Sequence, residues 1–185
     1  MTTGLANPWC SCPVAALIKI DHSFTTRAAR ADILRFCTRC GEPAESPPRD
    51  ESPLSQARVC DACGMGVLLS CTREALPGAR AAFVIATASL KVNAVSVGAE
   101  EIFGPEQGVI GSYLLDLVTS PMGDAHFAKL VTGAAVRSRE PVVMPVKSLR
   151  NSSGEGGMLA ARVSTCGPPR AALVTVEPSG FGRAR

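Results

Sequence analysis

The C-terminal part of the chain is built from short apolar runs that end at glycine, proline or polar residues. Residues 81–86 form a continuous apolar run, which predicts a buried strand. Residues 90–96 predict a second strand, because Lys91 and Asn93 alternate with apolar neighbours. The two runs are separated by the polar turn at 87–89. This part of the sequence therefore begins with a predicted pair of strands.

Helical patterns follow the pair. Residues 99–103 predict one short helix that stops at Gly104, and residues 111–118 predict an apolar turn or a second short helix. Asp124 is a candidate N-cap for a longer helix that runs to about Val136. The apolar residues of this helix recur at the spacing of a buried face: Phe127, Leu130, Val131 and Ala134.

Three strand-like runs end the pattern, at residues 141–148, 158–165 and 170–177. The glycine-rich segment 151–157 links the first two, and residues 166–169 link the last two. The order is therefore two strands, short helices, one longer helix and three strands, which is typical of an α+β domain.

Four cysteines upstream form two matching steps, Cys-Thr-Arg-Cys-Gly at residues 37–41 and Cys-Asp-Ala-Cys-Gly at residues 60–64. Nineteen residues lie between Cys40 and Cys60, so Cys37, Cys40, Cys60 and Cys63 can converge on one tetrahedral ion. The glycine after each second cysteine predicts a turn with positive φ, with backbone N–H groups directed at sulfur. This pattern predicts a zinc site, with iron as the alternative metal.

The segment between the steps, residues 42–59, is rich in proline, serine and charge, so the metal is expected to hold its ends together. A short strand over residues 65–69 is expected to close the module, and Leu76-Pro77-Gly78 marks a boundary. The predicted organisation is an N-terminal segment (1–34), a zinc-ribbon-like module (35–76), a second domain (79–178) and a tail (179–185).

The N-terminal segment carries little interpretable pattern. Residues 25–34 predict a helix with Ile33 and Leu34 at its apolar end. We assign no function to residues 1–34 and leave open whether they are ordered.

Two motifs in the second domain resemble the PAS family of sensor domains. Residues 96–104, Ser-Val-Gly-Ala-Glu-Glu-Ile-Phe-Gly, resemble the N-x-A-A-x-x-L-F-G step of the family, with Ser96 in place of the common asparagine. Residues 108–118 resemble its L-I-G-x-x-L…D-L-V step. The resemblance covers residues 80–178. It implies a five-stranded antiparallel sheet with helices on one face, and a role in sensing a small ligand or in dimerisation.

The resemblance also implies candidate cofactors. Haem-binding members place a ligand near the start of the long helix, where His126 is a weak candidate. The reactive cysteine of light-sensing flavin domains has no counterpart in residues 99–104. No organic cofactor is therefore predicted for this domain.

The remaining cysteines give weaker signals. Cys166, in the turn before Gly167-Pro168-Pro169, is a weak redox candidate if it is exposed and if Arg162 or Arg170 lowers its pKa. A second metal site built from Cys10, Cys12, Cys71 and His22 matches no strong template. The alternative for Cys166 is a bystander thiol in a hairpin.

Composition and charge restrict the function. The chain has 185 residues and a formal net charge of +3, and residues 35–78 carry five basic and six acidic groups, so direct contact with nucleic acid is not expected. Phosphate-binding-loop, hydrolase-elbow and zinc-protease motifs are absent, and we expect no enzyme. No membrane span and no secretory signal are recognised, which with paired Cys-x-x-Cys spacing predicts a cytoplasmic protein with reduced thiols.

These observations lead to one main hypothesis. We expect a signalling or regulatory protein in which a PAS-like domain senses a ligand or dimerises, and a zinc module contacts protein partners, with transcriptional regulation as one output. The alternatives are a redox protein, using iron–thiolate chemistry or Cys166, and a zinc-ribbon adaptor for nucleic acid or polymerase.

Overall fold

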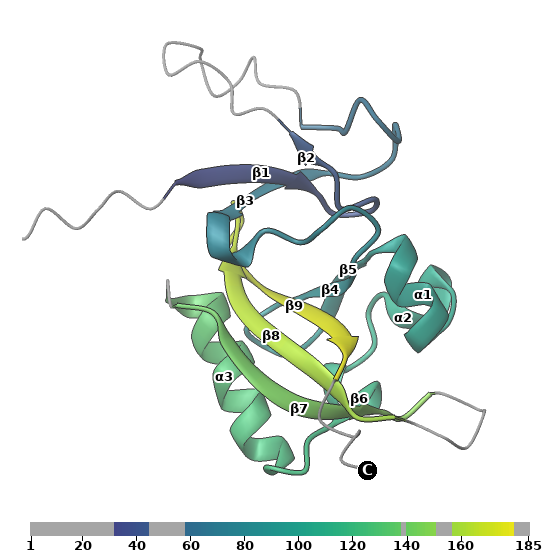
Figure 1. Cartoon of the computed structure of the whole chain (residues 1–185), viewed down its shortest axis with the longest axis vertical. Helices are drawn as coiled ribbons and strands as arrows, with labels where there is room; N and C mark the ends of the chain where they lie inside the picture. The colour runs from purple at the N-terminus through teal and green to yellow at the C-terminus, as the bar shows by residue number, and fades with distance from the viewer. Residues whose placement is uncertain (1–31, 45–57, 138–139, 151–156, 180–185) are drawn as a thin grey trace, which may run out of the picture. The chain divides into compact units, whose positions relative to one another are not determined.

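The structure is a computed structural model, and it describes residues 32–44, 58–137, 140–150 and 157–179. The described residues belong to one compact unit, in which two antiparallel sheets and the helices that pack on them are seen (Figure 1). None of the helices in the described ranges is long and apolar enough to cross a bilayer.

The larger sheet confirms the α+β prediction and corrects its strand number. It has six strands in the order β5-β4-β9-β8-β7-β6, and every pairing is antiparallel. The extra strand arises because Val118, expected at the end of a turn or short helix, and the following Thr119 are extended and pair with Ser148 and Lys147. A two-residue strand is too short to leave an alternating pattern. The strands are β4 (Ala82–Ala86), β5 (Val92–Val95), β6 (Val118–Thr119), β7 (Val142–Ser148), β8 (Leu159–Cys166) and β9 (Ala171–Pro178).

The helices are α1 (Val97–Phe103), α2 (Glu106–Val109) and α3 (Asp124–Val136), with a 3-10 turn η2 at Leu114–Asp116. Figure 1 shows α3 lying along β8 and β9. Phe103, Leu114, Leu117 and Phe127 are fully buried between these elements and one face of the sheet.

Ser96 begins α1 in the way an asparagine would. Its hydroxyl accepts a hydrogen bond from Ala99 N (3.2 Å) and another from Phe83 N (2.9 Å), and donates one to Ala81 O (2.8 Å). A serine N-cap of this kind stabilises a helix by about 1 kcal/mol. Serine at position 96, where the motif commonly has asparagine, therefore still caps the start of the helix.

Asp124 has a different role from the one expected. The N-cap of α3 is Gly123, and the carboxylate of Asp124 accepts hydrogen bonds from Ser120 N (2.9 Å) and Thr119 Oγ1 (2.8 Å). These bonds lower the pKa of Asp124. The carboxylate thus fixes the loop that enters the helix instead of capping it.

The smaller sheet has the order β2-β1-β3, with β1 (Ile33–Cys37), β2 (Pro43–Ala44) and β3 (Leu68–Thr72), and a 3-10 turn η1 (Arg73–Ala75) follows. Two predictions are wrong here. Ile33 and Leu34 are in a strand instead of a helix, because they pair with Thr72 and Cys71 of β3. The closing strand lies at 68–72 rather than 65–69, because the residues before it form the second metal turn. The rest of the predicted helix lies outside the described residues.

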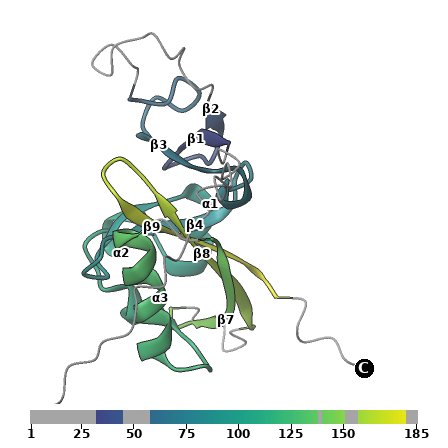
Figure 2. The same ribbon diagram turned by 90° about the vertical axis from the view of Figure 1, so that its left-hand side faces the viewer.

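A second core joins the smaller sheet to the larger one. Side chains alternate along β4, so Val84 and Ala86 face the helices whereas Phe83 and Ile85 face the smaller sheet. The rings of Phe36 and Phe83 meet edge to face with centroids 5.8 Å apart, and both are fully buried. Ser70 N donates to Gly167 O (2.6 Å), so the turn between β8 and β9 lies beside β3 (Figure 2).

Candidate metal centre

The four cysteines of the two matching steps come together. Their sulfur atoms all lie within 4.8 Å of one another. Sγ of Cys37 is 3.6 Å from Sγ of Cys63, and Sγ of Cys40 is 3.8 Å from Sγ of Cys60. Four sulfurs at about 2.3 Å from a tetrahedral zinc ion would be about 3.8 Å apart. The cluster therefore has the size that one metal ion requires.

The backbone of the two steps is closely similar. Gly41 and Gly64 have φ of 76° and 68°, which confirms the predicted turns. Gly41 N donates to Cys37 O (3.1 Å), and Gly64 N donates to Cys60 O (2.8 Å). Each step is thus a tight turn that presents its two sulfurs on the same side.

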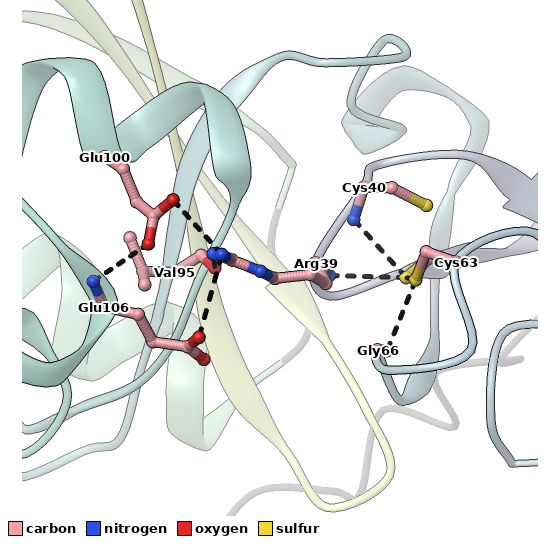
Figure 3. Close-up of polar contacts among 8 residues, drawn as sticks. Arg39, Cys40, Cys63, Gly66, Val95, Glu100 and Glu106 are labelled. Carbon is pink, nitrogen blue, oxygen red and sulfur yellow. Dashed lines mark hydrogen bonds and ion pairs between the residues drawn. The ribbon is translucent and has the colours of Figure 1, made fainter.

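Backbone N–H groups are directed at the sulfurs, as predicted (Figure 3). Arg39 N and Cys40 N donate to Sγ of Cys37 at 3.3 and 3.4 Å, and Gly66 N donates to Sγ of Cys63 at 3.4 Å. A Cβ on Gly66 would clash with Sγ of Cys37. Gly66 is therefore a site residue that we did not predict. The only hint of it in the sequence is a further glycine two residues after Gly64, close to the second cysteine step.

The protein environment acts in opposite directions on two of the thiols. Burial raises the pKa of Cys37 to about 12. Hydrogen bonds from the backbone of Met65 and Gly66 lower the pKa of Cys63 to about 6. A bound cation favours the thiolate form of every ligand, so it offsets the cost of burying Cys37.

The donor set decides what such a centre can do. Four thiolates suit zinc or iron, and the sequence predicted zinc with iron as the alternative. Cys37 and Cys60 are buried, and Cys40 and Cys63 are half-buried. Four protein ligands fill a tetrahedral ion, which leaves no position for a water or substrate. The geometry thus fits a structural metal centre.

The first cysteine turn contacts the larger sheet and its helices directly. The guanidinium of Arg39 lies 3.1 Å from Oε2 of Glu100 in α1, and donates to Val95 O at 3.3 Å (Figure 3). Val97 N donates to Arg39 O at 2.9 Å, and Arg80 N donates to Cys40 O at 3.2 Å. The residues between the metal ligands are therefore also the residues that hold α1.

Of the weaker candidates, Cys71 and Cys166 lie in one core, and His126 is not part of it. His126 is exposed in the first turn of α3, whereas its neighbour Phe127 is buried. Cys166 is buried instead of lying in an exposed turn, and burial raises its pKa to about 12. Cys71 is buried in the same core, with a pKa raised by burial to about 11. Cys10, Cys12 and His22 lie outside the described residues.

Comparisons with known proteins give a structural likeness. No protein-family model and no curated protein matches the sequence. The chain is similar to the PAS domain of nitrogen regulation protein NR(II) from Vibrio parahaemolyticus, with a TM-score of 0.43 and 16% sequence identity, over 54% of this chain and 90% of that chain.

Proposed function

We propose that this chain is a regulatory protein in which a structural zinc ion fixes a small module to the outer face of a PAS-like domain. In this proposal the PAS-like domain senses a small ligand or mediates dimerisation, and the signal passes to protein partners through contacts. Transcriptional regulation in the cytoplasm is the setting that we infer. No catalytic step is part of the proposal.

One observation carries the proposal: the module that holds the four cysteines shares a hydrophobic core with the PAS-like domain and makes a polar contact with it. Phe36, one residue before the first ligand, packs on Phe83 of the larger sheet. Arg39, between the first two ligands, binds Glu100 of α1. These contacts support a structural role for the metal, which would hold the module in place on the sensor domain. Four protein ligands leave no open coordination position at which the metal could do chemistry of its own.

Metal content and the absorption spectrum of the purified chain test the metal assignment. We expect one zinc ion per chain and no visible colour. Red iron–thiolate bands would favour the redox alternative, and a Soret band would restore haem binding at His126. Salt-dependent binding to DNA or RNA would favour the adaptor alternative, since phosphate contacts weaken as salt rises.

The regulatory role needs a separate experiment. Chemical cross-linking in the native cell, followed by mass spectrometry, is expected to capture a defined protein partner with the wild type and to lose it with Cys60→Ala. Cys71→Ala is the matched control, because Cys71 is also buried but is not in the metal cluster. Substrate turnover that survives Cys60→Ala would contradict the proposal.

A further inference from the structure

A cavity of about 360 Å³ lies between the second cysteine turn and the outer face of the larger sheet. Gly66 and Val67 line it from the module, and Ile85, Ala94 and Val95 line it from β4 and β5. Its volume is within the range of small-molecule sites. Ile85 and Ala171 line it from the face of the sheet that carries the second core, and Glu106 at the start of α2 lies at one end.

Most of the cavity wall is apolar. Leu69, Ile85 and Ala171 belong to the second hydrophobic core, and their side chains form part of the wall. At the mouth, Met65 is 73% exposed and Val67 is 48% exposed, although both are large apolar residues. Such a wall favours the apolar part of a ligand.

One end of the cavity is polar. Arg39 and Glu106 line this end. The guanidinium of Arg39 also pairs with Glu100, which does not line the cavity, so the three side chains together carry a formal charge of −1 (+1 − 2). Glu100 is the closer partner at 3.1 Å, whereas Glu106 is 3.8 Å away, beyond hydrogen-bonding distance. Glu106 therefore offers a carboxylate, 37% exposed, to a cation in the cavity.

The edge of β5 does not favour an added peptide strand. Val92 exchanges hydrogen bonds with Gly111 and Ser112, and Val95 O accepts from Arg39. Strand addition needs free N–H and C=O groups along an edge. The occupied edge and the small volume both favour a small molecule over an extended peptide.

We propose that this cavity binds a small organic cation, with its apolar stem against Ile85, Ala94 and Val67 and its ammonium group at the carboxylate of Glu106. The site goes beyond the proposed function, since it lies outside the space between the sheet and the helices. It requires only that the two cysteine turns are folded.

The test uses the metal-loaded full chain and three probes with the same six-carbon stem: hexylammonium, hexanol and hexanoate. Nuclear magnetic resonance titration is expected to shift the amide signals of Gly66, Ala94, Val95 and Glu106 with hexylammonium. The expected affinity for hexylammonium is about tenfold higher than for hexanol, as for a charged hydrogen bond, with hexanoate the weakest. Equal affinities for the three probes, no shifts, or shifts confined to residues facing α3 would overturn the proposal.

Two variants locate the binding determinants. Glu106→Gln is expected to lower hexylammonium affinity about tenfold, to the level of hexanol, whereas Glu101→Gln, an exposed neighbour, should leave it unchanged. Ala94→Leu should weaken both hexylammonium and hexanol by narrowing the cavity. Unchanged hexylammonium affinity in Glu106→Gln would overturn the proposal, as would binding of a lysine peptide but not of hexylammonium. Zinc content, measured on the same samples, reports separately on the proposed structural metal.

Discussion

The two faces of the larger sheet are covered in different ways. On the helix side, 22 buried residues from the sheet and the helices form one continuous hydrophobic cluster. On the module side, the cluster has nine buried residues, and two of them are cysteines. The module side therefore has much less apolar surface with which to offset the entropy of ordering its chain.

This difference indicates what the metal contributes. A small module with a modest core needs another source of free energy, and a zinc ion in such modules supplies about 10–16 kcal/mol. The helix side has the extended core that an ordinary domain requires and needs no such ion. The comparison predicts that the two faces respond differently to metal loss, core truncation and changes in polar contacts.

Metal removal is expected to have the largest effect. A strong chelator should abolish the protection of amides in β1 and β3 against hydrogen exchange, while amides in α3 and β8 remain protected. Cys60→Ala should reproduce this pattern, and Cys71→Ala should not, since Cys71 is not a ligand. Simultaneous loss of protection in both regions would show that the two faces are not independent.

Truncation of Phe36 is expected to have the next largest effect on stability. Phe36→Ala removes a fully buried ring from the module side and should lower the free energy of unfolding by about 3–5 kcal/mol. Ile33→Ala, on the same strand but exposed, should change it by less than about 0.5 kcal/mol. Urea denaturation measures both, and equal effects would contradict the shared core.

The two glycines of the second cysteine turn should differ. Gly66→Ala places a methyl group against Sγ of Cys37, so zinc affinity is expected to fall about 10–100-fold. Gly64→Ala introduces strain at φ of 68° but projects into open space, and should cost about 1–2 kcal/mol of stability without disturbing the ligands. Competition with a chromophoric chelator measures zinc affinity. A greater loss of zinc affinity in Gly64→Ala would contradict the geometry.

The contact between Arg39 and Glu100 should contribute more to the free energy of unfolding than a surface ion pair does. Their side chains are 18% and 26% exposed, and a double-mutant cycle with alanine is expected to give a coupling of about 1–2 kcal/mol. The more exposed pair Arg162–Glu177 should give less than about 1 kcal/mol. If the two cycles give the same coupling energy, the contact between Arg39 and Glu100 does not specifically stabilise the attachment of the module to α1.

The smallest effect expected is the pH dependence caused by Asp124 on the helix side. Its pKa is lowered in the folded chain, so its contribution to stability is present above the ordinary value of 3.8 and is lost as pH falls through the folded pKa. Asp124→Asn should therefore be less stable than the wild type near neutral pH and should converge with it in acid. Thermal unfolding at several pH values measures the difference, and a constant gap down to the lowest pH would contradict the sign.

Local patterns predicted much of this structure. The spacing of four cysteines and two glycines indicated the metal turns, because the residues that shape each turn are neighbours in sequence. The strand near residues 81–86 and the helix near 124–136 were also visible, because each has its own periodicity. The start of β1 was not visible, since Ile33 and Leu34 become a strand only by pairing with β3.

Contacts between residues that are distant in the chain could not be predicted from the sequence. The packing of Phe36 on Phe83 and the bond from Arg39 to Glu100 depend on how the two sheets meet. Gly66 is required by the position of Cys37, 29 residues earlier (66 − 37), and not by its neighbours. The sequence predicted Cys166 in a turn. The residue is buried because it packs in the second core with residues of the smaller sheet, which are distant in sequence.

X-ray absorption at the zinc edge tests the central claim most directly. The account predicts four sulfur atoms at about 2.3 Å from a single zinc ion in the purified chain, falling to three in Cys60→Ala. A shell that contains nitrogen or oxygen in the wild type, or an unchanged spectrum in the variant, would contradict it.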